Sequence, residues 1–335
     1  MTTSSTKLHL NELPFAPNTN VLEPSQSAIQ NVNRYPEWDG MTLRSALAQH
    51  WGIEPEWVIV SGGGSIGVIQ QTMVASGSGA IAYGWPSFEP FDMAATALGK
   101  PIVHVDLKEH ACDLEALAKS VTAETSMVIV CTPNAPTGGV VKWTDVAHFL
   151  QQVSSDVIVL IDEAYGEFAD VDAGIDSLLF VQKYPNVLLT RTFSKAYGLA
   201  GMRVGYGIAQ PELATRIMLA GLPFPVSAPY AAAAVAALED QSTLRQNVVK
   251  IGAERARLAA RLRALGAEVV EGYGNFVWLP LGGLVDKVTQ LLKDKGVLVK
   301  PVVPYGVRIT VGTQEDTENV CRAWGEANIT QEITG

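Results

Sequence analysis

Lys195 lies in a segment whose residue types could bind a phosphorylated aldehyde covalently. The segment spans residues 191–203 and directly follows the apolar stretch 186–190. A lysine amine forms a Schiff base with a carbonyl group, and Thr192, Ser194 and Arg203 supply hydrogen-bond donors for a phosphate. Pyridoxal phosphate carries both groups on one ring. Most lysines are solvated surface charges, so this interpretation depends on whether other segments supply the rest of a cofactor site.

Asp162 directly follows the apolar run 157–161. A carboxylate at the edge of a buried sheet requires a cation, and the protonated ring nitrogen of pyridoxal phosphate is a suitable one. A helix-capping or salt-bridged aspartate is the alternative. Tyr165 and Asn134 could both hydrogen-bond the phenolic oxygen of the same ring, although either residue alone would more often belong to a turn.

A glycine cluster precedes a predicted helix. Gly62, Gly64 and Gly67 match the pattern G-x-G-x-x-G, which occurs in NAD sites. The acidic residue that such sites place after the next strand is missing, since no carboxylate follows that strand before Glu89. The backbone N–H groups and Ser65 at the start of a helix predict a simpler anion site, which would hold a phosphate monoester. A tight turn without a ligand is the alternative.

Short apolar runs alternate with helical stretches along the first two thirds of the chain, at 57–60, 80–83, 102–105, 127–130, 157–161 and 187–189. This alternation predicts an α/β fold with a mostly parallel sheet covered by helices on both faces. Ligands of such sheets bind beyond the carboxyl ends of the strands. The candidate site residues therefore lie at 62–65, 85–88, 133–134, 162–165 and 191–203.

The last third of the chain predicts a smaller α+β unit. Residues 226–265 have the composition of one long helix, and strands are expected at 276–279, 297–299 and 307–310. We therefore expect an N-terminal arm and small-domain segment at 1–30, a large cofactor-binding domain at 31–225, and a connecting helix with a small C-terminal domain at 226–335.

Composition narrows the classes of function. The chain has 335 residues, 47% of them hydrophobic, which is enough for two unequal domains. Its 24 basic and 34 acidic residues give a net charge of −10, which disfavours binding to nucleic acid or to an anionic membrane. Its apolar runs are too short to span a bilayer.

The three cysteines are odd in number and widely spaced, and no apolar segment of a signal peptide follows residues 1–7. Both features favour a reducing cytoplasm. No metal site is expected, because the histidines lack the spacing of zinc ligands: His9, His50, His104, His110 and His148.

Taken in order, these motifs resemble the fold-type I pyridoxal-phosphate-dependent aminotransferases, and in particular the branch of histidinol-phosphate and aromatic amino acid aminotransferases. The resemblance extends over nearly the whole chain, through residues 10–17, 34–36, 62–67, 131–138, 162–165, 191–203 and 306–313. It implies a large domain with a mostly parallel seven-stranded sheet flanked by helices, and a smaller α+β domain.

The resemblance also implies roles for the residues around the cofactor ring. Lys195 would form the Schiff base with pyridoxal 5′-phosphate and later move the proton of the substrate Cα. Asp162 would pair with the ring nitrogen. Asn134 and Tyr165 would hydrogen-bond the phenolic oxygen, and Phe88 would stack on the ring.

Further roles concern the phosphate and the substrate. Tyr35 is implied to reach the phosphate of a neighbouring subunit, so a homodimer is expected. Arg308 would bind the substrate carboxylate through two hydrogen bonds, and Asn11 would lie close to the substrate. Lys300 stands where histidinol-phosphate enzymes usually have an arginine, and it would contact the substrate. The phosphate of the cofactor would be held by Gly64, Ser65, Thr192, Ser194 and Arg203.

The resulting hypothesis is transfer of an amino group from an aromatic or other bulky L-amino acid to a 2-oxo acid such as 2-oxoglutarate. Ser65-Ile66 and Ala135 depart from the family pattern without removing a catalytic group. Three alternatives remain: a histidinol-phosphate aminotransferase, a decarboxylase of an O-phospho amino acid with the same fold, and a non-catalytic cofactor-binding module.

Overall fold

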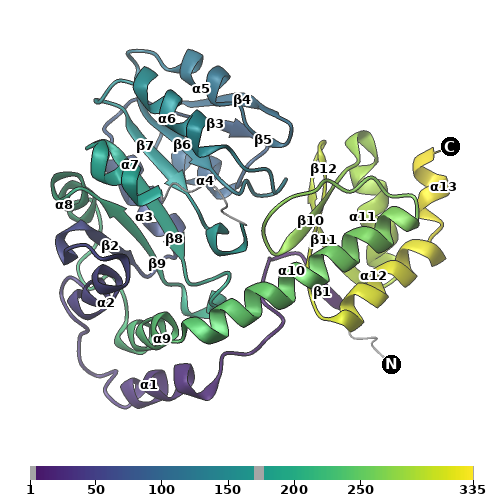
Figure 1. The fold of residues 1–335 in the computed structure, drawn as a ribbon, viewed down its shortest axis with the longest axis horizontal. Coiled ribbons are helices and arrows are strands. Elements are labelled where there is room, and N and C mark those ends of the chain that lie inside the picture. The colour runs from purple at the N-terminus through teal and green to yellow at the C-terminus, as the bar shows by residue number, and fades with distance from the viewer. Residues whose placement is uncertain (1–4, 170–176, 335) are drawn as a thin grey trace.

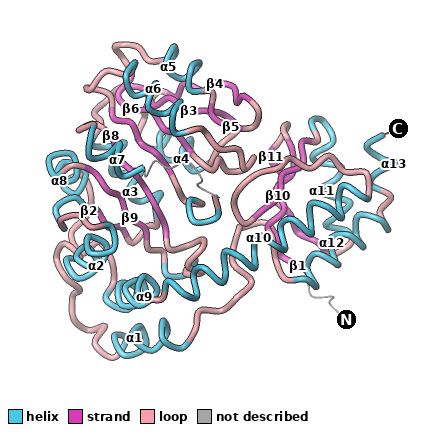
Figure 2. Tube along the Cα trace, viewed as in Figure 1, coloured by secondary structure: helices cyan, strands magenta, loops and turns pink. Residues whose placement is uncertain are grey.

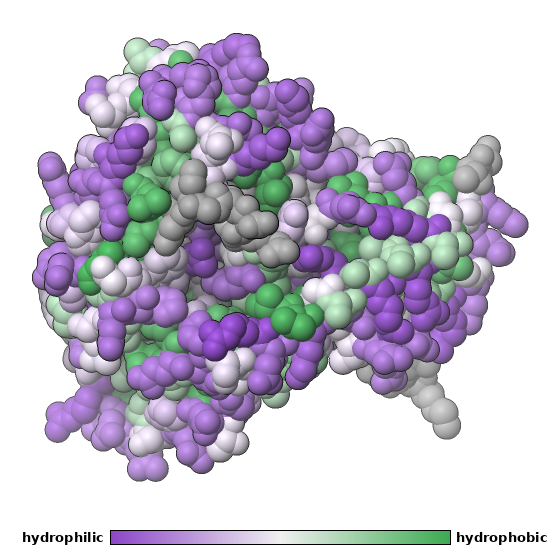
Figure 3. All heavy atoms as spheres, viewed as in Figure 1, coloured by the Kyte–Doolittle hydropathy of each residue, from purple (hydrophilic) through white to green (hydrophobic). Residues whose placement is uncertain are grey.

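The computed structural model describes residues 5–169 and 177–334. The described chain forms a larger and a smaller lobe joined at a narrower waist (Figures 1 and 3). Residues 1–4, the first of the predicted N-terminal arm, lie outside the described residues.

The larger lobe is built on one sheet, which has eight strands among the described residues in the order β2-β9-β8-β7-β6-β3-β4-β5. Pairs β3–β4, β3–β6, β6–β7 and β7–β8 are parallel, as predicted. The strands are β2 (Val58–Ser61), β3 (Ala80–Trp85), β4 (Ile102–Lys108), β5 (Ala111–Cys112), β6 (Thr125–Cys131), β7 (Ile158–Asp162), β8 (Val187–Thr192) and β9 (Gly205–Ala209).

The sheet has one strand more than the predicted seven. The additional strand is the two-residue β5, which folds back antiparallel on the end of β4. Strand β9 was not located by its sequence, Gly-Tyr-Gly-Ile-Ala, because glycine and alanine are poor markers of strands. It lies antiparallel between β8 and β2, where neighbours on both sides impose the extended conformation.

Side chains along these strands alternate between two helical layers, as the period of two in a strand requires. In β2, Val58 and Val60 face one layer and Ile59 faces the other. The first layer contains α2 (Met41–Trp51), α5 (Leu114–Ser120), α6 (Trp143–Gln152), α7 (Ser177–Lys183) and α9 (Ala228–Glu239). The second contains α3 (Ser65–Ala75), α4 (Pro90–Ala97) and α8 (Pro211–Leu219). Burial on both faces explains why the strand sequences are apolar throughout.

The helix predicted over 226–265 is two helices, α9 and α10 (Gln241–Ala264), which meet at Asp240. Asp240 adopts φ −90° and ψ 60°, and its carboxylate accepts a hydrogen bond from the backbone N–H of Thr243. An aspartate that caps a helix start in this way interrupts a continuous helical pattern. Helix α9 packs against α1 (Thr19–Ile29) and α2, whereas α10 runs on into the smaller lobe (Figure 1).

The smaller lobe has a sheet of four strands among the described residues, in the order β1-β11-β12-β10. Strand β1 (Thr6–Leu8) pairs in parallel with β11, so the N-terminal segment and the C-terminal third form one sheet. Helices α10 and α12 pack on one another and on this sheet (Figure 2). We propose that the two sheets are the cores of the two expected domains. The remaining elements are β10 (Phe276–Pro280), β11 (Val297–Val302), β12 (Gly306–Thr310), α11 (Val285–Asp294), α12 (Gln314–Glu326), α13 (Ile329–Thr334) and the 3₁₀ turns Pro55–Trp57, Gly166–Phe168, Ala200–Met202 and Gly282–Leu284.

Among the described residues, the structure contains no helix with both the length and the apolar character needed to cross a membrane.

Candidate active site

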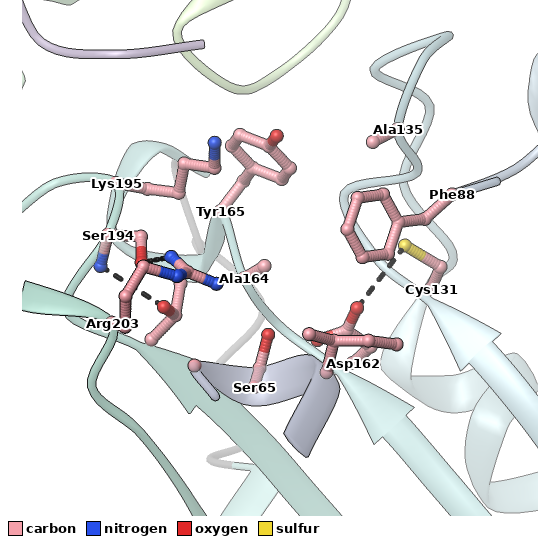
Figure 4. Close-up of a pocket in the computed structure, with 13 residues that line it drawn as sticks. Ser65, Phe88, Cys131, Ala135, Asp162, Ala164, Tyr165, Ser194, Lys195 and Arg203 are labelled. Atoms are coloured by element: carbon pink, nitrogen blue, oxygen red, sulfur yellow. Dashed lines mark hydrogen bonds between the residues drawn. The ribbon is translucent and has the colours of Figure 1, made fainter. Parts of the chain in front are cut away.

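A cavity of about 90 Å³ lies beyond the carboxyl ends of β6, β7 and β8, where the parallel sheet predicts a ligand site. Figure 4 shows Lys195 and Tyr165 on one side of this cavity, Phe88 and Cys131 on the other, and Asp162 at its base. Its lining residues are Gly64, Ser65, Ile66, Phe88, Cys131, Ala135, Asp162, Ala164, Tyr165, Thr192, Ser194, Lys195 and Arg203.

Lys195 is held over the cavity by the turn that follows β8. Phe193 is fully buried two residues earlier and anchors this turn in the core. The Lys195 amine donates to the backbone carbonyls of Leu10, at 3.1 Å, and Asn11, at 3.2 Å. Loss of hydration, together with the positive charge of Arg308, lowers the pKa of Lys195 to about 7. A substantial fraction of this amine is therefore neutral and nucleophilic near pH 7.

Asp162 is the last residue of β7 and is 2% exposed. Its Oδ1 accepts a hydrogen bond from the Thr190 hydroxyl at 3.0 Å, and its Oδ2 lies 4.0 Å from the Cys131 sulfur. Burial raises the pKa of Asp162 to about 7. A cationic ring nitrogen would relieve this burial and restore the ionised carboxylate.

The N-terminus of α3 and the guanidinium of Arg203 form an anion site. Ser65 opens this eleven-residue helix, so its first N–H groups have no acceptor within the helix. Arg203 has φ 56° and donates to the Ser194 hydroxyl at 3.2 Å and to the Gly63 carbonyl at 3.0 Å. Helix N-termini bind phosphate through such N–H groups, and a guanidinium adds charge.

Thr192 completes this end of the cavity. Its hydroxyl accepts a hydrogen bond from the backbone N–H of Ser194 at 3.1 Å, which fixes the turn between β8 and Lys195. The predicted phosphate residues Gly64, Ser65, Thr192, Ser194 and Arg203 therefore lie together.

Tyr165 and Asn11 connect the cavity to the N-terminal segment. The Asn11 side-chain amide donates to the Tyr165 hydroxyl at 2.8 Å, and Asn11 is fully buried. The Thr310 hydroxyl donates to the Asn11 side-chain oxygen at 3.0 Å, and the Asn275 amide donates to the Asn11 carbonyl at 3.0 Å. Asn11 thus joins both sheets at the site.

Asn134 lies close to the cavity without lining it. Its side chain accepts from the Ser87 hydroxyl at 2.8 Å and donates to the Pro86 carbonyl at 3.0 Å and the Thr137 hydroxyl at 2.8 Å. These bonds fix the segment that carries Phe88, whose ring lies against the cavity (Figure 4).

A second cavity, of about 200 Å³, adjoins the first and shares Phe88, Ala135, Tyr165 and Lys195 with it. Arg308 lines this second cavity and donates to the His9 carbonyl at 2.8 Å. Its Nε atom is buried without a hydrogen-bond partner among the described residues. An unpaired guanidinium N–H beside the Lys195 amine is suited to a substrate carboxylate.

Lys300 also lines the second cavity, and its amine contacts the Glu89 carboxylate at 2.6 Å. Tyr35, in contrast, lies outside both cavities. Its side chain is 83% exposed and stacks on Phe224, with 4.7 Å between ring centroids.

The residues present fit pyridoxal phosphate. The amine of Lys195 is available for its aldehyde, the buried Asp162 lacks the cation that its ring nitrogen would supply, and the start of α3 with Arg203 suits its phosphate. These three groups surround one cavity because β7 and β8 end there, α3 begins there after β2, and the antiparallel β9 begins there just after Arg203.

Several residues near the site were not predicted. Cys131 and Ile66 line the first cavity, and Glu89 lines the second. Ile66 directly follows the predicted segment 62–65, and Cys131 is the last residue of β6, two residues before the predicted segment 133–134, so the positions of both were a usable signal. Glu89 directly follows the predicted segment 85–88, but its pairing with Lys300 had no local signal, because Lys300 belongs to the other sheet.

Comparisons with known proteins agree with this geometry. A sequence profile of aminotransferase class I and II matches residues 3–323. An aromatic amino acid aminotransferase of Thermobifida fusca is 39% identical over 329 residues, which cover 97% of this chain and 91% of that protein. One of Streptomyces coelicolor is 41% identical over 315 residues, covering 92% and 87%. The crystal structure of histidinol-phosphate aminotransferase from Sinorhizobium meliloti in complex with pyridoxal 5′-phosphate has a TM-score of 0.88 and 26% identity, covering 98% of this chain and 92% of that one.

Proposed function

The chain belongs to the aminotransferase class I and II family, and from that premise we propose that it transfers the amino group of an aromatic L-amino acid to a 2-oxo acid such as 2-oxoglutarate. It is a fold-type I enzyme with pyridoxal 5′-phosphate as its cofactor, and it acts on amino acids and 2-oxo acids. The observation that carries the proposal is the pair of adjoining cavities. Lys195 lies between the anion site of Arg203 and the guanidinium of Arg308, whose Nε has no hydrogen-bond partner among the described residues.

In this proposal, residues of the first cavity bind the cofactor, and residues of the second cavity bind the substrate. Bound pyridoxal phosphate supplies an electron-accepting ring and an aldehyde carbon that carries the amino group between two half-reactions. Lys195 removes the proton from the substrate Cα, because its low pKa leaves the amine partly neutral. Asp162 holds the ring nitrogen in its cationic form, and Arg308 orients the substrate through its carboxylate.

The remaining residues position these groups. In the proposal, Gly64, Ser65, Thr192, Ser194 and Arg203 hold the phosphate, and Phe88 stacks on the ring. Tyr165 hydrogen-bonds the phenolic oxygen, together with Asn134 if its amide leaves one of its present partners. Asn11 and Lys300 lie nearest the substrate.

The second cavity supports a bulky side chain as the preferred donor. Its walls include Leu10, Pro90, Pro136 and Val302 beside the ring of Phe88. The relatives named aromatic amino acid aminotransferases add to this support. Histidinol phosphate is the second candidate donor, favoured by the cation Lys300 in the same cavity.

We also propose a homodimer in which Tyr35 reaches the phosphate of the neighbouring subunit. Its support is an exposed apolar patch, defined by the exposed side chains of Tyr35, Trp38, Leu219 and Leu222 together with the half-buried ring of Phe224, which contacts Tyr35 and Trp38. Tyr35, Leu219 and Leu222 are each more than four-fifths exposed. Apolar surface of this kind on a single chain marks an interaction site. A reducing compartment such as the cytoplasm completes the proposal, supported by Cys112, Cys131 and Cys321, which are all free.

Borohydride reduction and a donor panel test the proposed function together. Borohydride reduction of the cofactor-loaded protein should leave the cofactor covalently attached to the peptide that contains Lys195. Lys195→Arg should abolish both this attachment and the transamination activity. Lys183→Arg, at an exposed position on α7, is the matched control and should retain both.

The panel compares phenylalanine, tyrosine and histidinol phosphate as donors to 2-oxoglutarate. We expect the two aromatic donors to have the higher kcat/KM. A higher value for histidinol phosphate would replace the aromatic proposal with the second candidate. Release of carbon dioxide without a 2-oxo acid product would contradict the transaminase mechanism.

A further inference from the structure

Glu89 and Lys300 form an ion pair across the second cavity. Glu89 directly precedes α4 in the larger lobe, and Lys300 belongs to β11 in the smaller lobe. Their charged atoms are 2.6 Å apart, and their side chains are 44% and 35% exposed. Both residues line the second cavity, so this ion pair is part of the surface that a substrate side chain would contact.

The position of Lys300 relative to Arg308 shows which part of a substrate reaches this pair. Lys300 and Arg308 are directly opposite one another in the antiparallel ladder of β11 and β12. Side chains of opposite residues project from the same face of a sheet, about 5 Å apart at Cβ. A substrate whose carboxylate binds Arg308 therefore extends its far end towards Lys300 and Glu89.

The charges around this cavity would be strongly positive without Glu89. Among the described residues that line the cavity, Lys195, Lys300 and Arg308 are basic and His9 is titratable. Glu89 is the single acidic residue among them. Glu89 thus neutralises the cation that would otherwise attract an anionic group.

We propose that Glu89 is a specificity-determining residue that sets the charge accepted by the side-chain subsite. This inference deepens the proposed function, on which it rests. While the Glu89 carboxylate is paired with the Lys300 amine, the side-chain subsite has no net charge. It therefore accepts an aromatic side chain without desolvating an unpaired cation. A single carboxylate can replace the Glu89 carboxylate on Lys300, charge for charge, while the half-exposed Glu89 turns to water. A doubly charged phosphoryl group cannot be balanced in this way and is repelled by the nearby carboxylate.

Three non-reacting probes with different far ends test the proposal on the cofactor-loaded protein. Each carries one carboxylate for Arg308. The far end of 3-phenylpropionate is neutral, that of glutarate has one negative charge, and that of 3-phosphonopropionate has nearly two at about pH 8.5. Their dissociation constants are measured by titration calorimetry at about pH 8.5. Binding does not require turnover, so the result is independent of whether an aromatic donor is transaminated.

Glu89→Gln should increase the affinity for 3-phosphonopropionate relative to 3-phenylpropionate by about tenfold, and that for glutarate by a smaller factor. Lys300→Met should lower the affinity for both anionic probes relative to the phenyl probe. The matched control is Glu115→Gln, which removes the same charge from an exposed 2.6 Å ion pair with Lys119 on α5. It should leave the three affinities in their original ratio.

Two outcomes would overturn the proposal. If Glu89→Gln changes all three affinities by the same factor, the ion pair only joins the two lobes. If the phosphonate gains no affinity relative to the phenyl probe, Glu89 does not select by charge. Failure of the proposed function would instead appear as the absence of transamination of phenylalanine and tyrosine by the unmodified protein, whatever the ratios of the probe affinities.

Discussion

At the scale of residues, the site contains two ionisable side chains whose charged forms are unfavourable without a bound cofactor. Burial shifts the pKa of Lys195 and that of Asp162 to about 7, one from above and one from below. Each residue lacks an opposite charge in direct contact among the described residues. The cofactor would supply a cationic ring nitrogen for Asp162 and would bind the Lys195 amine covalently through its aldehyde. Without the cofactor, protein stability should depend on pH through these two residues.

Asp162→Asn tests that dependence. Because the pKa of Asp162 is raised on folding, the native protein retains a proton between about pH 4 and pH 7 that the unfolded chain has lost. Its contribution to the unfolding free energy therefore falls as pH rises through this window. Asparagine removes this effect and can still accept the hydrogen bond of Thr190. Between about pH 4 and pH 7, the cofactor-free variant should gain stability relative to the unmodified protein, by about 1.4 kcal/mol for each pH unit.

Urea unfolding of both cofactor-free proteins, followed by circular dichroism at several pH values, provides the measurement. Parallel stability profiles would show that Asp162 is solvated or paired in the cofactor-free state. Cofactor binding should reverse the ranking, because the ionised carboxylate then has a partner that asparagine cannot match.

Residue chemistry predicted most of the first cavity, and the family resemblance predicted Arg308 and Lys300 of the second, but not the contacts between loops and between sheets. Lys195 and Asp162 could be placed because each follows an apolar strand, and parallel strands bring their carboxyl ends together. The contacts of Asn134 with Pro86 and Thr137 could not be predicted, since they depend on how two loops pack. The pairing of Glu89 with Lys300 joins positions 211 residues apart, on different sheets, and no local pattern indicates it.

At the scale of elements, the N-terminal segment after β1 closes the site. Asn11 has φ 54°, in the left-handed region that residues with a Cβ rarely adopt. Its side chain also bonds Tyr165 and Thr310. Two substitutions separate these contributions, because alanine and glycine both lose the side-chain bonds whereas glycine alone accepts the backbone conformation without strain.

Asn11→Ala should therefore destabilise the protein more than Asn11→Gly, by about 1 kcal/mol. Both variants should be less stable than the unmodified protein, by about 1–3 kcal/mol for the buried groups left unpaired. Thermal or urea unfolding of the cofactor-free proteins measures the difference. Equal stability of the two variants would mean that the segment relaxes to another backbone conformation.

The start of α3 depends on a close approach by β9. A Cβ atom at Gly205 would lie 2.2 Å from the backbone nitrogen of Ser65 and from the carbonyl carbon of Gly64. Gly205→Ala should push the helix start away from Arg203 and weaken cofactor binding by at least about tenfold, because a displacement of this kind removes more than one charged hydrogen bond. The dissociation constant follows from absorbance titration of the cofactor-free protein.

Gly252→Ala is the control for that substitution. Gly252 lies within α10, and an added Cβ would meet no heavy atom within 4 Å. Alanine there should leave cofactor affinity intact and raise stability by about 1 kcal/mol through its higher helix propensity. Unaltered affinity in Gly205→Ala would show that the phosphate is held mainly by side chains.

Elements were predicted where their own sequence decides the conformation. The apolar runs of β6 and β7 are long enough and rich enough in β-branched residues to be recognised. The sequences of β9 and of the break at Asp240 were misread, since a strand of glycine and alanine depends on its neighbours and a single capping aspartate is a weak signal within a long helical pattern.

At the scale of the whole molecule, the exposed apolar patch predicts that the chain binds a second subunit. Tyr35 stacks on Phe224, and Trp38 lies edge-on to the same ring with 5.1 Å between centroids. The patch is therefore ordered by its own contacts while its outer surface stays exposed. A rigid aromatic surface of this kind is suited to a second copy of the chain, because little side-chain freedom is lost when it is buried.

Leu219→Asp combined with Leu222→Asp should convert a dimer into a monomer of 35.8 kDa in sedimentation velocity. Both leucines are more than four-fifths exposed, so the folded chain itself should be little affected. Because the proposed dimer brings the Tyr35 hydroxyl to the neighbouring phosphate, the monomer should also lose cofactor more rapidly on dialysis.

Tyr35→Phe separates the two effects: it should remain dimeric and yet bind the cofactor more weakly, by a few-fold for one hydrogen bond. A double variant that stays dimeric would place the subunit interface elsewhere, and a Tyr35→Phe dimer with undiminished cofactor affinity would remove Tyr35 from the phosphate site.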